Sequence, residues 1–315
     1  AARGRLELPA VGFGTSFYPE DHELGPEEAV VSAAVDAALR SGVRLFDCAN
    51  QYSSQPFVGA ALERAVAQGV VAREDLVVVA KIARFGTEAE VRAGVQTALA
   101  ELRLDSVDVL MPHIPPPVDS WKWFEDEVDA GRARFLGVSN FDQLDVGEPG
   151  SGVRALRELL RVARIRPAVH EFELHPLLHD EAMVELCRTE GIRILAYSPL
   201  GAPHKVDKYL AGVGRLQGAA EAARRKRELS VLQHPGVEAV ARYRGATPAL
   251  TTLRWHVQHG FVPIPKSWNA EHIAANGPAA VCAEQLGATE MSVLDGMHSD
   301  VRTVVLYKKG AAGEL

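Results

Sequence analysis

The stretch Val43-Arg44-Leu45-Phe46-Asp47-Cys48-Ala49-Asn50-Gln51-Tyr52 combines a short apolar run with an acid and, five residues later, a tyrosine. The apolar run predicts a buried strand with Asp47 at its C-terminal end. The next two strongly apolar runs, at 76–82 and 107–113, end in Lys81 and His113. In a parallel β/α barrel the C-terminal ends of the strands converge on the face that carries the active site. We therefore expect the acid, the lysine and the histidine to meet there.

The rest of the chain alternates between strand-like and helix-like segments, which indicates parallel pairing of the strands. Helices are predicted at 26–41, 56–67, 87–102, 124–130, 153–162, 181–190, 237–243 and 248–259, and further strands at 133–138, 168–174, 193–197 and 261–266. With a strand at 12–15 the count reaches eight, each followed by a helix. The sequence thus predicts one (β/α)8 TIM barrel, an α/β domain over residues 1–315, with long rim loops and an N-terminal β-hairpin formed by 5–8 and 11–15.

The alternation breaks between residues 201 and 233, a segment too long for an ordinary connection. Long excursions at a barrel rim are often lids or binding loops. This one includes the basic run Arg224-Arg225-Lys226-Arg227, for which the simpler interpretation is the solvated face of an amphipathic helix.

The composition excludes several classes of protein. A net charge of −7 over 315 residues disfavours nucleic acid as the main partner. We find neither an apolar core of a signal peptide near the N-terminus nor an apolar run of the roughly 18 residues that a membrane helix needs. The three cysteines are far apart and form neither a disulfide framework nor a zinc pattern. These features predict a cytoplasmic protein and give no indication of its oligomeric state.

The residues at the three strand ends suggest proton-transfer chemistry. A lysine that leaves a buried strand needs a partner because burial disfavours its charge, and Asp47 is the natural counter-ion. Tyr52 can reach the same place after a short turn, and a positive charge beside a phenol favours the phenolate. His113 could then orient a carbonyl oxygen. Any one of these residues alone could be a structural ion pair or a packing histidine, but four at successive strand ends favour an active site.

Other catalytic motifs are missing from the sequence. There is no Gly-x-Gly-x-x-Gly after a strand, no His-Glu-x-x-His, no Cys-x-x-Cys and no Gly-x-Ser-x-Gly. His175 and His179 are four residues apart but stand in a loop-like context beside Pro176, so we interpret them as packing or surface residues and predict no metal site.

Several stretches, in their order and spacing, resemble the aldo-keto reductase family over nearly the whole chain. They are Gly12-Phe13-Gly14-Thr15, Phe46-Asp47-x-Ala49-x-x-Tyr52, Lys81, His113, Gly137-Val138-Ser139-Asn140-Phe141, Glu173-Leu174-His175-Pro176, Tyr197-Ser198-Pro199-Leu200-Gly201, Leu253-Arg254-Trp255 and Ile264-Pro265-Lys266-Ser267. The resemblance implies a single (β/α)8 barrel that reduces aldehydes or ketones with NADPH, without a Rossmann fold.

The resemblance also implies roles for individual residues. Tyr52 would be the general acid, Lys81 paired with Asp47 would lower the pKa of Tyr52, and His113 would bond the substrate oxygen. The resemblance implies that Thr15 binds the cofactor, that Ser139, Asn140 and Glu171 contact the nicotinamide carboxamide, and that Tyr197 stacks on the ring. It implies further cofactor contacts for Ser198 and Leu200 along the pyrophosphate, for Lys266, Ser267 and His272 at the 2′-phosphate, for Trp268 near the adenosine and for Asn276 at the adenine. A stacked ring and a cation at a phosphate are physically consistent roles.

Some positions depart from the family pattern. Glu171 stands where the family commonly has glutamine, and an ionised carboxylate there would favour an oxidised, cationic ring. His272 replaces an arginine and cannot form a bidentate contact with the 2′-phosphate, and Ala275 removes a further adenosine contact. We therefore expect NADP(H) as cofactor, with NAD(H) as an alternative. Ser16 and Ile114 replace large aromatic residues, and Trp121 and Trp123 could either fill the resulting space or simply pack.

Three functions remain in competition. The first is a carbonyl reductase acting on a small-molecule carbonyl or alcohol, with neither nucleic acid nor membrane as partner. The second is a lyase that uses Lys81 as a Schiff-base nucleophile, which requires a lysine free of a tight acid pair. The third is a non-catalytic barrel that keeps the cofactor site as a sensor or regulatory subunit.

Overall fold

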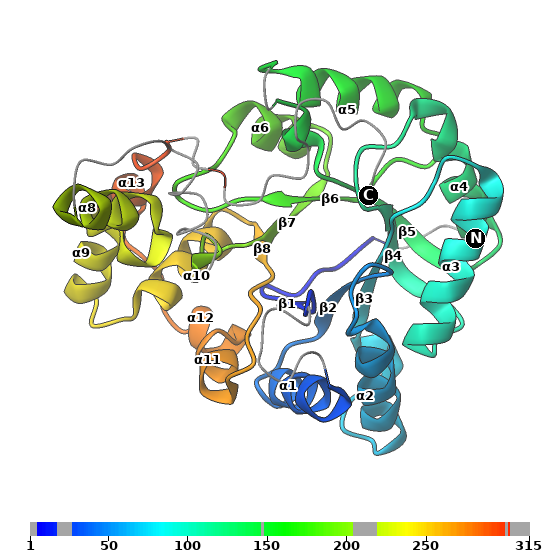
Figure 1. Ribbon diagram of the computed structural model, residues 1–315, viewed down its shortest axis with the longest axis horizontal. Coiled ribbons are helices and arrows are strands. Elements are labelled where there is room, and N and C mark those ends of the chain that lie inside the picture. Colours follow the sequence, from blue (N-terminus) through cyan, green and yellow to red (C-terminus); the bar gives the residue numbers. More distant parts are fainter. Residues whose placement is uncertain (1–4, 18–26, 146–147, 204–218, 300–301, 303–315) are drawn as a thin grey trace.

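The eight strands of the protein form one parallel barrel in sequence order (Figure 1). The computed structural model describes residues 5–17, 27–145, 148–203, 219–299 and 302. The strands are β1 (Phe13–Gly14), β2 (Leu45–Ala49), β3 (Val77–Ile82), β4 (Val107–Pro112), β5 (Ala133–Ser139), β6 (Val169–Glu173), β7 (Arg193–Tyr197) and β8 (Val262–Pro263). Two backbone hydrogen bonds close the ring between its last and first strands, from Gly12 N–H to Pro263 O (2.9 Å) and from Gly14 N–H to Pro265 O (3.1 Å).

Helices surround the barrel and connect its strands (Figure 1). They are α1 (Glu28–Arg40), α2 (Gln55–Ala67), α3 (Glu88–Leu102), α4 (Trp121–Asp129), α5 (Ser151–Val162), α6 (Glu181–Thr189), α8 (Ala219–Leu229), α9 (Pro235–Tyr243), α10 (Pro248–Gln258), α11 (Ala270–Ala275), α12 (Pro278–Val281) and α13 (Ala288–Asp295). Local signals set their ends: Thr87 and Glu90 form a capping box at the start of α3, and Gly42, with φ +88°, follows α1. The predicted (β/α)8 barrel is confirmed.

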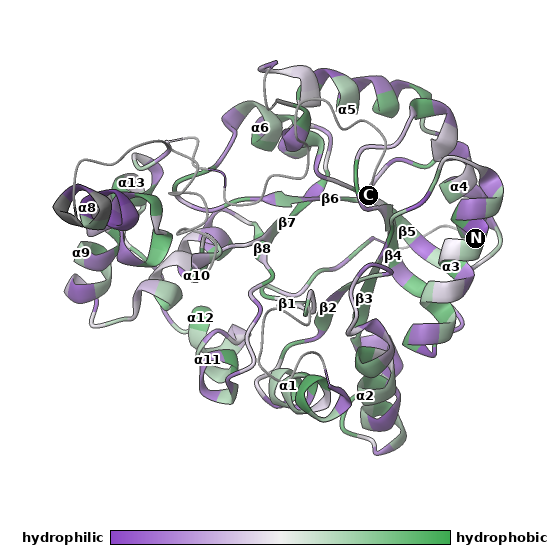
Figure 2. Ribbon diagram, viewed as in Figure 1, coloured by the Kyte–Doolittle hydropathy of each residue, from purple (hydrophilic) through white to green (hydrophobic). Residues whose placement is uncertain are grey.

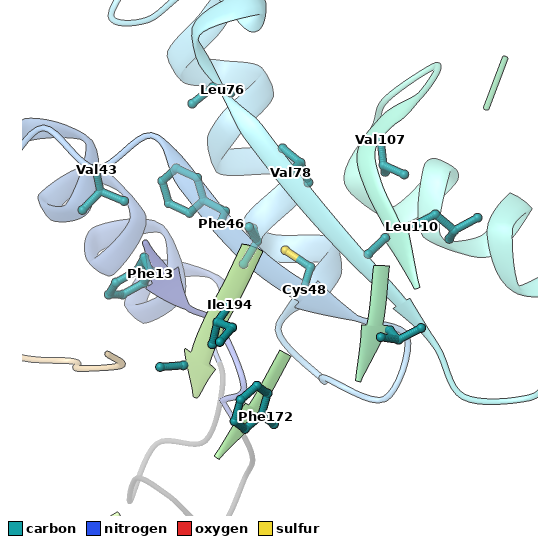
Figure 3. Packing of buried hydrophobic residues seen from close by; sticks show 14 of the residues in the cluster. Phe13, Val43, Phe46, Cys48, Leu76, Val78, Val107, Leu110, Phe172 and Ile194 are labelled. Carbon is teal, nitrogen blue, oxygen red and sulfur yellow. The ribbon is translucent and has the colours of Figure 1, made fainter. Parts of the chain in front are cut away.

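Strand alternation divides the core into two layers. Inward-facing residues such as Leu45, Val79, Val109, Val169 and Leu195 fill the barrel. Their neighbours in sequence face outward and pack under the helices; Figure 3 shows Phe46, Cys48, Val78, Leu110, Phe172 and Ile194 in this outer layer. Figure 2 shows hydrophobic and hydrophilic residues alternating around the helices, as expected for helices with one face on the core and one in solvent.

The inward register places polar residues directly above the apolar filling. Because side chains two residues apart along a strand share a face, Asp47 follows Leu45, Lys81 follows Val79 and Glu171 follows Val169 into the barrel interior. The charged layer therefore lies at the C-terminal ends of the strands, as predicted from the sequence.

The predicted N-terminal hairpin is wrong for the part of it that the structure describes. Residues 5–10 form no strand, and Phe13–Gly14 pairs with β2 as the first strand of the barrel. Leu6 and Leu8 instead pack, partly buried, against the apolar filling of the barrel. Their alternation with charged residues resembles a strand, but burial of the two leucines against the barrel satisfies the same pattern.

The segment at 201–233 contains a helix where it is described. Residues 204–218 lie outside the described residues, and α8 follows them. Arg224 bonds Glu228 within α8 (2.6 Å), and Arg227 bonds Glu238 of α9 (2.6 Å), with both arginine side chains more than half exposed. The basic run is thus a solvated helix face, as the simpler interpretation has it. Across the described residues, no helix is both long and apolar enough to span a membrane.

The helices α11, α12 and α13 have no counterpart in the prediction. All three are short, and periodicity gives little signal over four to eight residues. Local capping residues mark two of them, since the Asn269 side chain accepts from the first N–H groups of α11 and Glu290 bonds back to Gly287 before α13.

Candidate active site

An acid, a lysine and a second acid meet inside the barrel at the ends of β2, β3 and β6. Lys81 is fully buried, and its Nζ donates to Asp47 Oδ1 and, at 3.0 Å, to Glu171 Oε1. Both carboxylates are also almost fully buried. The predicted Asp47–Lys81 pair is therefore present. Glu171, for which the family resemblance implies a contact with the cofactor, is a second partner of Lys81.

The electrostatics of this cluster favour a charged lysine and a protonated glutamic acid. Burial by itself would lower the pKa of Lys81, but the charges of Asp47 and Glu171 raise it well above its usual value. Burial raises the pKa of Glu171 to about 8, and the charge of Asp47 adds to this against the opposing effect of Lys81. The single positive charge of Lys81 can balance the negative charge of only one of the two buried carboxyl groups, so the other is more stable when protonated.

Tyr52 and His113 stand beside the lysine. Lys81 Nζ lies 5.1 Å from the centre of the Tyr52 ring, and the rings of Tyr52 and His113 are 5.7 Å apart in an edge-to-face arrangement at 80°. Tyr52 is mostly buried, with 9% of its surface exposed. The four residues predicted to carry catalysis thus lie together.

His113 is a neutral imidazole in this setting. Burial, followed by the positive charge of Lys81, lowers its pKa to about 3. Its Nδ1 is buried without a hydrogen-bond partner among the described residues. A neutral ring has one N–H to donate, so His113 can bond a carbonyl oxygen without carrying a charge.

A polar network extends from His113 to Tyr197. Asn140 has a left-handed backbone (φ +64°), a conformation that asparagine tolerates better than most residues. Its Nδ2 donates to the carbonyl oxygen of His113 (2.7 Å) and to Ser139 Oγ (2.9 Å), and its Oδ1 accepts from the Tyr197 hydroxyl (2.8 Å). Three residues predicted at the nicotinamide are thereby held in one group next to the four residues predicted to be catalytic.

Thr15 connects β1 to the same group through backbone contacts. Its N–H and its hydroxyl both donate to the carbonyl oxygen of Asp47, at 3.2 and 2.7 Å, and its own carbonyl oxygen accepts from the Ser54 hydroxyl. Thr15 is fully buried, so in this structure its side chain fixes the backbone at Asp47.

Lys266 begins a second region at the end of β8. Its Nζ donates to the carbonyl oxygen of Ser16 (3.0 Å) and lies 5.6 Å from the centre of the Phe17 ring, on which Trp268 stacks at 3.7 Å. Lys266, Ser267 and Asn276 line one small cleft together with Gly12, Phe13, Val43, Pro265 and Ile273. Three of the predicted adenosine-end residues therefore share a cleft.

The remaining predicted residues are more dispersed. His272 is exposed on α11, where its backbone N–H donates to the Asn269 side chain (3.1 Å). Ser198 has a left-handed backbone (φ +45°) directly after β7. Leu200 packs beside Val11, Leu253 and Val281 in a separate apolar cluster.

Three residues near Tyr197 were not predicted. Gln143 Nε2 donates to the Tyr197 hydroxyl (3.2 Å), and the buried Asp142 is paired with Arg302. Burial raises the pKa of Asp142 to about 6 against the opposing charge of Arg302. Asp142 and Gln143 directly follow the Ser139-Asn140-Phe141 stretch and could have been found from it, whereas Arg302 is 160 residues away from its partner and carries no local signal.

Four residues noted in the sequence are packing residues. His175 is fully buried near Glu173 (3.4 Å), and the ring of His179 contacts Trp255. No group of three or more metal-ligating side chains with suitable geometry occurs among the residues that the structure covers. Trp121 is 1% exposed and bonds the carbonyl oxygen of Ile165, while the partly buried Trp123 packs against the outer core.

Glu171→Gln is expected to change the pH dependence of stability. A carboxyl group whose folded pKa is raised from 4.5 to about 8 stabilises the fold fully below its unfolded pKa, and this contribution is lost as the pH rises through about 8. The unfolding free energy of wild type relative to the variant should therefore fall as the pH rises, by at most about 1.4 kcal/mol per pH unit. Urea denaturation at pH values near 5 and near 8 measures this, and an equal difference at both would contradict it.

Comparison with known proteins agrees with this geometry. The chain is 32% identical over 289 residues to aldo-keto reductase family 4 member C11 of Arabidopsis thaliana, covering 86% of this chain and 80% of that protein. It is 29% identical over 300 residues to an NADPH-dependent D-xylose reductase of Meyerozyma guilliermondii (86% and 85% covered) and 30% identical over 324 residues to aldo-keto reductase family 1 member A1 of Mus musculus (95% and 89% covered). The model of the aldo/keto reductase family matches residues 10–298, and the chain belongs to this family.

Proposed function

We propose that the protein reduces an aldehyde or ketone to an alcohol, with Tyr52 as the general acid and Lys81, Asp47 and His113 as its partners. Membership of the family and its NAD(P)H-dependent relatives make the chain an NAD(P)H-dependent oxidoreductase. The observation that supports the residue assignment is the position of Tyr52, whose ring lies beside both a buried ammonium and a neutral imidazole.

The chemistry follows from that position. When bound, a reduced nicotinamide would supply a hydride to the carbonyl carbon. His113 donates its N–H to the carbonyl oxygen and orients it, and Tyr52 gives its proton to the same oxygen as negative charge develops there. The Lys81 ammonium stabilises the phenolate that remains, and Asp47 keeps Lys81 in place and charged. Each residue thus has one task that its surroundings suit.

The residues present fit a nicotinamide dinucleotide. Ser139 and Asn140 can hold the carboxamide, and the Tyr197 ring, whose hydroxyl is fixed by Asn140 and Gln143, can stack on the ring. Lys266, Ser267 and Asn276 lie together and can supply a cation and polar groups for the adenosine 2′-phosphate. Because His272 is exposed and forms no bidentate fork, we propose NADP(H) with substantial use of NAD(H).

The Schiff-base alternative is disfavoured by the same contacts. A lysine nucleophile must lose its proton, and Lys81 is held between two carboxyl groups that raise its pKa well above the usual value. Borohydride reduction in the presence of a carbonyl ligand should therefore trap no covalent adduct on Lys81.

Fluorescence titration with NADPH and NADH tests the cofactor assignment. We expect both to quench tryptophan fluorescence, with NADPH binding more tightly. His272→Arg should tighten NADPH by about tenfold, because an added phosphate contact is worth on the order of 1.5 kcal/mol, and should leave NADH unchanged. The exposed Glu271→Gln on the same helix is the matched control. Failure of both dinucleotides to bind would overturn the proposed function, and equal tightening of both would remove His272 from the 2′-phosphate.

A further inference from the structure

Glu171 is the third member of the buried cluster that it forms with Asp47 and Lys81. It is 2% exposed, it sits on β6 opposite Leu195 of β7 and Ser139 of β5, and its Oε1 accepts from Lys81 at 3.0 Å. Its second oxygen, Oε2, is buried and accepts no hydrogen bond from any described residue. A buried carboxylate oxygen without a donor is costly, and a proton on the carboxyl group removes that cost.

The neighbour that can share such a proton is Asp47. Both carboxyl groups contact the same Lys81 ammonium, and the negative charge of Asp47 adds to the burial that raises the pKa of Glu171. The proton thus belongs to the pair, with Lys81 in contact with both members. Protonated, the three groups carry no net charge; deprotonated, they carry one negative charge.

Three other titratable groups near Glu171 do not change charge near neutral pH, although Cys48 among them faces outward from the barrel. Burial raises the pKa of the Cys48 thiol on β2 to about 12, and burial lowers the pKa of His113 after β4 to about 3. Lys81 on β3 stays charged because the pKa of its ammonium is raised well above the usual value. Compared with these three groups, the carboxyl pair is the one that gains or loses a proton around pH 8, beside Tyr52, whose own proton is assigned to the catalytic step.

The pair also adjoins the residues assigned to the nicotinamide. Ser139 is the register partner of Glu171 across β5 and β6, and the Asn140 N–H donates to the Glu171 carbonyl oxygen (2.9 Å). The reduced and oxidised nicotinamide rings differ by one positive charge, so a titrating carboxyl group at this place distinguishes them by charge alone.

We propose that Glu171 selects between the two redox states of the dinucleotide, keeping its shared proton when the reduced, neutral ring is bound and releasing it to solvent when the oxidised, cationic ring is bound. The inference rests on the proposed function. It balances as a binding step: the protonated pair and the oxidised dinucleotide give the ionised pair, the bound dinucleotide and one free proton. The affinity for the oxidised cofactor then depends on pH through Glu171, and that for the reduced cofactor does not.

The test is the ratio of the dissociation constants of NADP⁺ and NADPH, measured by fluorescence titration at several pH values below about 8. The adenosine 2′-phosphate and His272 are common to both complexes, so their titration cancels in the ratio. In wild type the ratio should fall by up to about tenfold per pH unit as the pH rises. In Glu171→Gln, whose amide oxygen can still accept from Lys81 and whose amide N–H can donate to Asp47, the ratio should be flat.

Glu125→Gln is the matched control. Glu125 is also a buried glutamate, 6% exposed, but it lies on α4 and bonds Arg164 and the Ile165 N–H. Its variant should keep the wild-type slope. The same slope in Glu171→Gln as in wild type overturns the proposal, and so does a flat ratio in wild type.

A second measurement covers the case in which Glu171→Gln does not fold. Calorimetric titration of wild type in two buffers of different ionisation enthalpy counts the protons exchanged on binding. We expect NADP⁺ to release a large fraction of one proton and NADPH to release little. Equal proton counts would overturn the role of Glu171 while leaving the reductase assignment intact. Failure of either dinucleotide to bind would instead remove the proposed function and this inference with it.

Discussion

Tyr52→Phe is expected to lower kcat for carbonyl reduction by about 10²–10⁴-fold, the usual contribution of a positioned general acid. The phenylalanine ring fills the same space beside His113 and Lys81 but has no proton to give. Binding of the dinucleotide should change little, because the assigned carboxamide and ring contacts come from Ser139, Asn140 and Tyr197. Single-turnover reduction of a reactive aldehyde, combined with a fluorescence titration, separates the two effects.

Tyr243→Phe is the matched control for this experiment. Tyr243 is 81% exposed at the end of α9, so the same loss of a hydroxyl group should leave kcat unchanged. Turnover within a few-fold of wild type in Tyr52→Phe would show that another group protonates the oxygen.

Lys81→Met should damage both turnover and stability. Removing the ammonium leaves Asp47 and Glu171 buried against each other without a counter-ion, and breaking a buried pair in this way typically costs about 3–5 kcal/mol. The phenolate of Tyr52 also loses the charge that stabilises it, so kcat should fall strongly. Chemical denaturation and steady-state kinetics of the same preparation measure the two losses.

The double variant Lys81→Met, Glu171→Gln separates stability from catalysis. It replaces one of the two buried carboxyl groups that lack a counter-ion, so part of the lost unfolding free energy should return while turnover stays low. Lys122→Met on the exposed face of α4 is the control and should alter neither. A Lys81→Met protein that is less stable but fully active would limit Lys81 to a structural role.

The barrel and the clustering of Asp47, Tyr52, Lys81 and His113 could be predicted because their signals are local. Each strand is a short apolar run, and its last inward position follows the apolar filling at a spacing of two, so Asp47 and Lys81 were placed from sequence alone. Tyr52 and His113 come directly after two of these strands. The alternation of side chains along each strand thus predicts where most of the site residues lie.

The parts that could not be predicted depend on contacts between distant segments. The double partnership of Lys81 joins β2, β3 and β6, and the attachment of Arg302 to Asp142 spans 160 residues. Leu6 and Leu8 alternate as a strand would, yet they pack against the barrel filling without pairing. In each case the residue contacts a partner that is distant in the sequence, and the two meet only because the barrel closes.

The first and last strands of the barrel, β1 and β8, meet at a seam that also lines the cleft at Lys266. Both strands are only two residues long, and Gly14 is needed there because a Cβ would lie 2.8 Å from the Ile264 carbonyl oxygen. The cleft that contains Lys266 is lined by residues from both sides of this seam, Gly12 and Phe13 on one and Pro265 and Ser267 on the other. A dinucleotide that bound Lys266 and residues across the seam would contact both ends of the barrel, so the free energy of its binding would also resist opening of the ring at its shortest strands.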